Sequence, residues 1–168
     1  MRIEIRGITV ENSADFLELL FKLDKETQFM MLEPNERHTS FDDMQQYLST
    51  LDESMSALIG AFDGNNLVGY IDVCRGNANR IKHSAYVIIG ILLSHTGQGI
   101  GEMLFKKADE WAVKHNIARL ELTVMVHNIN AIKLYEKVGF TKEGIKEKSM
   151  LINGHYVDEY YMGKILCI

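Results

Sequence analysis

Three glycines alternate with larger residues at Gly97, Gly99 and Gly101, between an apolar run and a helical pattern. Glycine lets the backbone approach a ligand without a Cβ atom in the way. The free N–H groups and the positive dipole end of a helix start both favour anions. The stretch therefore predicts a phosphate site, and a tight turn without a ligand is the alternative.

Two familiar nucleotide loops do not fit this spacing. The Walker A pattern and the dinucleotide pattern G-x-G-x-x-G, started at Gly97, both require a glycine where the chain has Glu102. A glycine loop of another kind remains.

A second group of candidate residues follows in VMVHNINAIKLYEKVGF, from Val124 to Phe140. Asn128 stands where a helix N-cap is expected. Tyr135 shares a helical face with Ala131 and Val138, so its spacing alone favours a core aromatic residue.

The elements that must position these residues follow from periodicity and turn signals. Strands are expected at residues 2–6, 56–62, 67–74, 85–94, 120–126, 140–151 and 155–166, and helices at 12–23, 40–51, 100–115 and 130–138. Turn residues at 63–66 and at Asn153-Gly154 predict two hairpins. This order predicts a single domain, residues 1–168, of the α/β (α+β) class, with helices on the faces of a mixed sheet.

Composition excludes several classes of function. The net charge of −5 argues against a nucleic-acid partner, whose phosphates require basic residues. The first residues lack the apolar core of a signal peptide, and no apolar run approaches the ~20 residues that span a membrane. The six histidines and two cysteines show no metal-ligand spacing. We expect a cytoplasmic protein without a metal or a membrane partner.

Together, the two motifs resemble those of the GNAT superfamily of N-acetyltransferases. That family's signature is Arg/Gln-x-x-Gly-x-Gly/Ala at a strand-to-helix turn, here TGQGIG from Thr96 to Gly101, followed by a strand, an Asn and a helix ending in LYEK-x-GF. Thr96 departs from the usual Arg or Gln. The resemblance implies a central, mostly antiparallel mixed sheet of about seven strands with about four helices on its faces.

The resemblance also implies acetyl-CoA as co-substrate. Backbone groups of Ile91 and Leu93 would pair with its pantetheine arm, and Asn128 would contact it. Tyr135 would act as the general acid toward the leaving thiolate. The pyrophosphate would bind at the loop and the first turn of the helix: Thr96, Gln98, Gly99, Ile100, Gly101 and Glu102.

The general base stays open. Some family members carry a Glu five residues before the Asn, where this chain has Thr123. Glu121, on the same strand face, and Glu33, in the first helix connection, are tentative candidates, as are the neighbouring Glu26 and Glu36. Asp158 and Glu159 could attract a cationic acceptor or be ordinary solvated charges.

The reaction implied is direct transfer of an acetyl group, in a ternary complex, to a primary amine of a small molecule such as an amino acid or a polyamine. The alternatives are a protein N-terminus or lysine as acceptor, and a non-catalytic acyl-CoA-binding module. The family resemblance also makes a homodimer possible.

Overall fold

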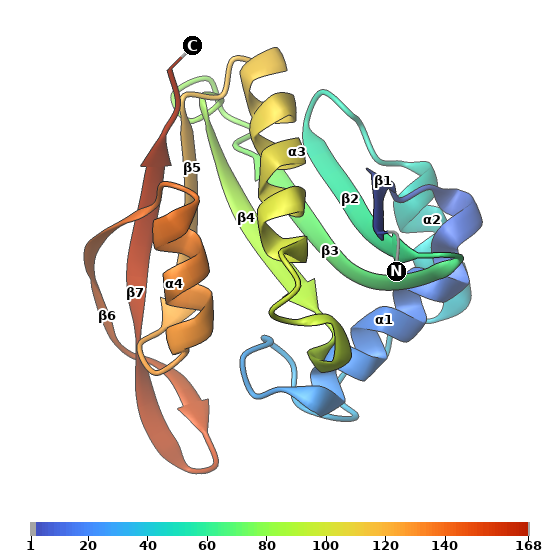
Figure 1. The fold of residues 1–168 in the computed structure, drawn as a ribbon, viewed down its shortest axis with the longest axis horizontal. Helices are drawn as coiled ribbons and strands as arrows, with labels where there is room; N and C mark the ends of the chain where they lie inside the picture. Colours follow the sequence, from blue (N-terminus) through green and yellow to red (C-terminus); the bar gives the residue numbers. More distant parts are fainter. Residues whose placement is uncertain (1–2, 168) are drawn as a thin grey trace.

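The computed structural model describes residues 3–167 and contains one seven-stranded sheet in the order β1-β2-β3-β4-β5-β7-β6 (Figure 1). Neighbouring strands are antiparallel except β4 and β5, which are parallel. The strands are β1 Ile3–Gly7, β2 Ser56–Asp63, β3 Asn66–Arg75, β4 Ser84–Ile91, β5 Arg119–Met125, β6 Thr141–Ile152 and β7 His155–Ile165. The mixed, mostly antiparallel sheet is confirmed.

Four α-helices accompany the sheet, as the sequence predicts: α1 Ser13–Glu26, α2 Phe41–Ser49, α3 Ile100–Lys114 and α4 Ile129–Lys137. Two short 3-10 helices, Val10–Asn12 and Leu93–His95, were not predicted, and the second replaces the end of the strand that was expected at 85–94. No helix in the described residues is long and apolar enough to cross a membrane.

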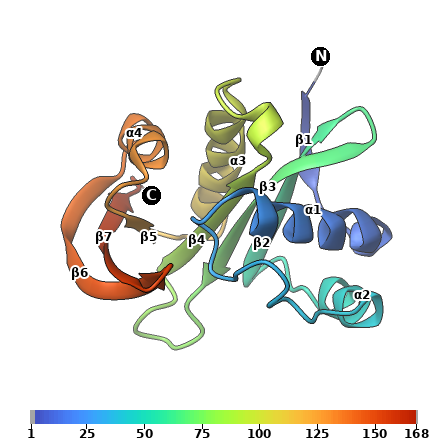
Figure 2. The same cartoon turned by 90° about the horizontal axis from the view of Figure 1, so that it is seen from below.

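The helices divide between the two faces of the sheet (Figures 1 and 2). On one face, α3 buries Leu104, Phe105 and Ala108 completely against the strands. On the other, α1 packs on β3, where the rings of Phe16 and Tyr70 meet edge to face at 5.1 Å. Burying these apolar stripes is the main favourable term that holds the layers together.

Backbone conformations confirm both predicted hairpins. Gly64 between β2 and β3 has φ +60°, and Asn153 and Gly154 between β6 and β7 have φ +50° and +78°. Asn and Gly tolerate this left-handed region better than other residues.

Strands β4 and β5 pair only at their beginnings. Three residue pairs join them: Ser84 with Arg119, Ala85 with Leu120, and Tyr86 with Glu121. Beyond Tyr86, β4 stays paired with β3, and beyond Glu121, β5 stays paired with β7. The sheet therefore opens between β4 and β5 toward the end where the glycine loop lies.

Candidate active site

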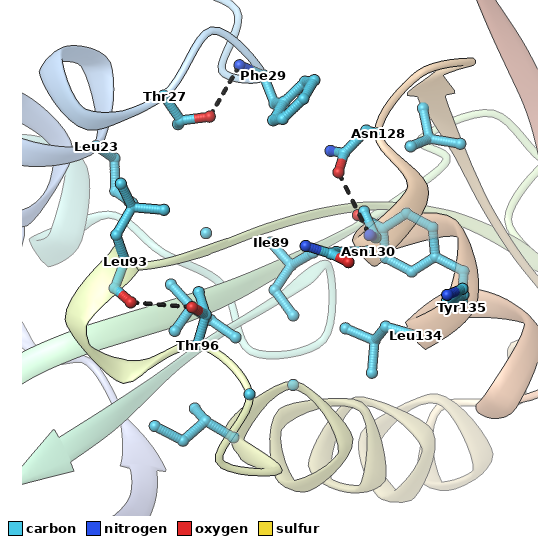
Figure 3. Close-up of a pocket in the computed structure, with 18 of the residues that line it drawn as sticks. Leu23, Thr27, Phe29, Ile89, Leu93, Thr96, Asn128, Asn130, Leu134 and Tyr135 are labelled. Atoms are coloured by element: carbon cyan, nitrogen blue, oxygen red, sulfur yellow. Dashed lines mark hydrogen bonds between the residues drawn. The ribbon is translucent and has the colours of Figure 1, made fainter.

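A cavity of about 680 Å³ occupies the opening between β4 and β5. Its walls are the second half of β4, the end of β5, the chain after α1, the glycine loop and α4. Figure 3 shows Leu93 and Thr96 on one side, Asn128 and Tyr135 on the other, and Ile89 between them. The predicted residues that line it are Ile91, Leu93, Thr96, Gly99, Ile100, Gly101, Glu102, Asn128 and Tyr135.

The glycine loop presents unpaired amides to this cavity. Gly97 and Gly99 have φ +73° and +80°, and Gly99 is the residue immediately before α3. Within residues 3–167, no protein acceptor is bonded to five successive backbone N–H groups, those of Gln98, Gly99, Ile100, Gly101 and Glu102. Unpaired donors at a helix N-terminus, reinforced by the helix dipole, form an anion site.

Side chains before the helix hold the loop in shape rather than reach into it. The Thr96 hydroxyl donates to the Leu93 carbonyl at 2.9 Å, and the Gln98 amide group donates to the Ser94 carbonyl at 3.1 Å. The side chain of Gln98 is turned to Ser94, and Gln98 is absent from the cavity wall.

Leu93 differs in geometry from a strand residue. It lies in the 3-10 helix beyond β4, and its backbone N–H donates to the Glu26 carboxylate at 2.9 Å. A ligand that pairs with this amide must displace Glu26, whereas Ile91 is still in the strand.

Two lysines of α4 add positive charge beside the loop. Lys133 and Lys137 both line the cavity, and Lys137 Nζ contacts Glu102 Oε1 at 2.7 Å. The sequence analysis missed them. Their spacing of four residues, which places them on one helix face, was the available signal.

Asn128 and Tyr135 each have a structural role and also line the cavity. Asn128 Oδ1 accepts from the Ala131 N–H at 3.3 Å, which caps α4, and the residue lines the cavity. Tyr135 is 8% exposed and meets Phe105 edge to face at 5.8 Å, yet it also reaches the cavity. Burial raises the pKa of its phenol, so the group stays protonated at neutral pH.

The candidate bases are placed very differently. Glu121 accepts from Arg119 at 2.8 Å, and Arg119 also binds Glu143 at 2.6 Å. Neither Glu121 nor Glu33 belongs to the cavity wall. Thr123 does line it, and its hydroxyl lies 2.9 Å from that of Tyr86.

The two acids of β7 separate. Asp158 accepts from the backbone N–H of Lys148 at 2.7 Å, whereas Glu159 lines the cavity.

Comparison with known proteins bears on this arrangement. Residues 17–140, which include β4, the glycine loop, β5 and α4, match the model of the Acetyltransferase (GNAT) family. The chain belongs to the GNAT family of acetyltransferases. Its seven-stranded sheet, opened between β4 and β5, is thus the GNAT fold.

Similar GNAT proteins span several acceptors. The chain is 35% identical to the L-amino acid N-acetyltransferase AaaT of Escherichia coli over 64% of this chain and 67% of that protein. It is 28% identical to the spermidine N(1)-acetyltransferase of Vibrio cholerae over 84% of this chain and 83% of that protein. It is 30% identical to the N-alpha-acetyltransferase RimI of Mycobacterium tuberculosis over 62% of this chain and 63% of that protein.

Among solved structures, a GNAT acetyltransferase from Streptococcus pneumoniae superposes with a TM-score of 0.92 at 26% identity, covering 99% of this chain and 100% of that one. The protein yncA of Salmonella typhimurium, whose structure holds acetyl-CoA, superposes with a TM-score of 0.87 at 15% identity, covering 98% of this chain and 94% of that one. The second likeness concerns the fold alone.

Proposed function

We propose that this GNAT protein transfers the acetyl group of acetyl-CoA to a primary amine of a small molecule. The carrying observation is that Tyr135 and four residues with unpaired backbone amides, Gly99, Ile100, Gly101 and Glu102, line one cavity. The amides suit the pyrophosphate, and the opening between the strands suits the narrow pantetheine arm.

In this proposal the amine attacks directly. The nitrogen lone pair forms the bond to the acetyl carbon, the carbon–sulfur bond breaks, and its electron pair goes to sulfur. Tyr135 gives its proton to that sulfur, and the proton leaving the nitrogen restores the phenol. The buried phenol suits this role because it is protonated at neutral pH.

The curated relatives support small amines as acceptors. Two are an L-amino acid and a spermidine acetyltransferase, and the spermidine enzyme matches over most of both chains. The RimI relative, an N-alpha-acetyltransferase, keeps a protein N-terminus as the second candidate.

Two measurements test the proposal. Calorimetry with acetyl-CoA should show binding, and no binding at millimolar concentrations would contradict the cofactor site. Thiol release with a panel of amino acids, polyamines and an N-terminal peptide should then show turnover. Binding without turnover for any amine would indicate a non-catalytic acyl-CoA-binding module.

Replacing Thr96 with arginine is expected to tighten acetyl-CoA binding by about two- to fivefold, because a charged donor beside a phosphate strengthens the contact. Loss of the 2.9 Å bond from Thr96 to Leu93 limits the gain. Calorimetry at low and high salt measures it, and weaker binding at low salt would count against the charge argument.

Lys133→Ala is expected to weaken acetyl-CoA binding by about three- to tenfold, because Lys133 lines the cavity and pairs with no carboxylate in residues 3–167. Lys106→Ala, on the exposed face of α3, is the matched control. Equal affinities for the two variants would show that Lys133 makes no phosphate contact.

A further inference from the structure

Glu159 lines the cavity from β7, beside the end of β5. It pairs with Met125 across β5 and β7, and Thr123 lies two residues earlier on β5. Residues directly opposite in an antiparallel pair share a face, so Glu159, Met125 and Thr123 lie on the same face of the sheet. Some GNAT proteins carry a glutamate at the position of Thr123. Glu159 places a carboxylate on the same face of the sheet, one strand away from that position.

The Glu159 side chain is mostly buried, and its carboxylate has no close partner. Glu159 is 8% exposed. Its nearest cation is Lys146 Nζ at 3.9 Å, on a half-exposed side chain, and no group within residues 3–167 donates a hydrogen bond to it. Burying a charge is costly unless it is paired and hydrogen-bonded. Glu159 is therefore free to accept a hydrogen bond from a cationic donor in the cavity.

The other carboxylates of the cavity wall are already engaged. Glu26 accepts from the Leu93 amide, and Glu102 accepts from Lys137 at 2.7 Å. Glu159 is the one that remains available among the described residues that line the cavity.

The surroundings of the cavity suit an alkyl chain. Phe29 and Met30 enter from the connection after α1, and Met125 lies directly opposite Glu159. Figure 3 shows the Phe29 ring extending from the chain after α1 toward Asn128. One unpaired carboxylate beside apolar side chains favours a cation carried on a hydrocarbon chain.

We propose that Glu159 binds the protonated nitrogen of the acceptor, which makes a primary alkylammonium compound the preferred acceptor class. The inference rests on the proposed acetyl transfer. Glu159 holds the ammonium group beside the thioester and takes one of its protons, which leaves the neutral amine that attacks. That proton passes to solvent, and a second proton, lost from nitrogen after attack, restores Tyr135.

Lys146 competes with the acceptor in this arrangement. Its ammonium group faces Glu159 across β6 and β7 at a distance too long for a hydrogen bond. Removing this cation should therefore favour a cationic ligand, whereas neutralising Glu159 should disfavour it. The two substitutions are therefore expected to change the amine affinity in opposite directions.

Calorimetry with spermidine, hexylamine and L-leucine amide, each added to the protein saturated with CoA, tests the site. Glu159→Gln should weaken the binding of these amines by at least about tenfold, and Lys146→Ala should tighten it by about two- to fivefold. Glu147→Gln, which removes an exposed charge of the same hairpin, should match the wild type. Acetyl-CoA affinity should be unchanged in all three variants.

Equal amine affinity in the wild type and Glu159→Gln, or no binding of any of the three amines to the wild type, would overturn the ammonium site. If Glu159→Gln does not fold, an unchanged or weaker affinity in Lys146→Ala overturns it instead. Thiol release separates this result from the proposed function. Undiminished turnover in Glu159→Gln would contradict the ammonium site and leave the proposed transferase activity standing. Amine binding that depends on Glu159, without turnover in the wild type, would support the site and contradict the transferase activity.

Discussion

Tyr135→Phe should lower kcat by about 10²- to 10⁴-fold, which is the usual contribution of a positioned general acid. The substitution removes only the hydroxyl, and the ring can keep its contacts with Phe105 and Phe140. The affinity for acetyl-CoA should therefore stay within about twofold of the wild type, and the loss should appear in kcat at saturating substrates.

The pH dependence gives the same experiment a second readout. Burial raises the pKa of Tyr135 above its usual value near ~10, so the phenol is still protonated through about pH 9. Activity should not decline through ionisation of Tyr135 in that range. Tyr156→Phe, on an exposed tyrosine of β7, should leave kcat unchanged. A Tyr135→Phe enzyme with wild-type kcat would assign Tyr135 to the core alone.

Gly99→Val should weaken acetyl-CoA binding by roughly tenfold or more. Gly99 has φ +80°, a conformation that costs an L-residue about 1–2 kcal/mol and a β-branched residue more. A Cβ atom here would meet no heavy atom within 4 Å, so it would project into open space beside the loop amides. Both effects hinder the approach of a pyrophosphate.

Gly154→Val separates the two effects. Gly154 has φ +78° and equally open space, but it lies in the β6–β7 turn, outside the cavity wall. Thermal unfolding should show a similar loss of stability in both variants, and calorimetry should show weakened acetyl-CoA binding only in Gly99→Val. Unchanged affinity in Gly99→Val would contradict the anion site at the loop.

Local patterns predicted the elements well because each depends on near neighbours in the chain. Ser40, the first residue of the helix predicted at 40–51, caps α2, with its hydroxyl accepting from the Asp43 N–H at 3.1 Å. Gly97 and Gly99 adopt the positive φ values that a glycine loop favours. The seven strands and four helices follow from the same kind of signal.

The carboxylate of the cavity wall near β5 could not be predicted in this way, because its position depends on which strands become neighbours. Glu121 and Glu159 are both strand carboxylates in the sequence. Only the placement of β7 beside β5, with Met125 opposite Glu159, brings one of them to the cavity. The partner that engages Glu121, Arg119, is local, but its second contact with Glu143 comes from β6.

The opening between β4 and β5 also gives the protein a strand edge in its interior. Along Ile88–Ile91, β4 has a hydrogen-bonded neighbour only on the β3 side, and the end of β5 has one only on the β7 side. Free strand edges ordinarily recruit other sheets and promote aggregation. Here the edges face a cavity enclosed by the α1–α2 connection, the glycine loop and α4. A slender, amide-bearing chain that enters the cavity can pair with these edges.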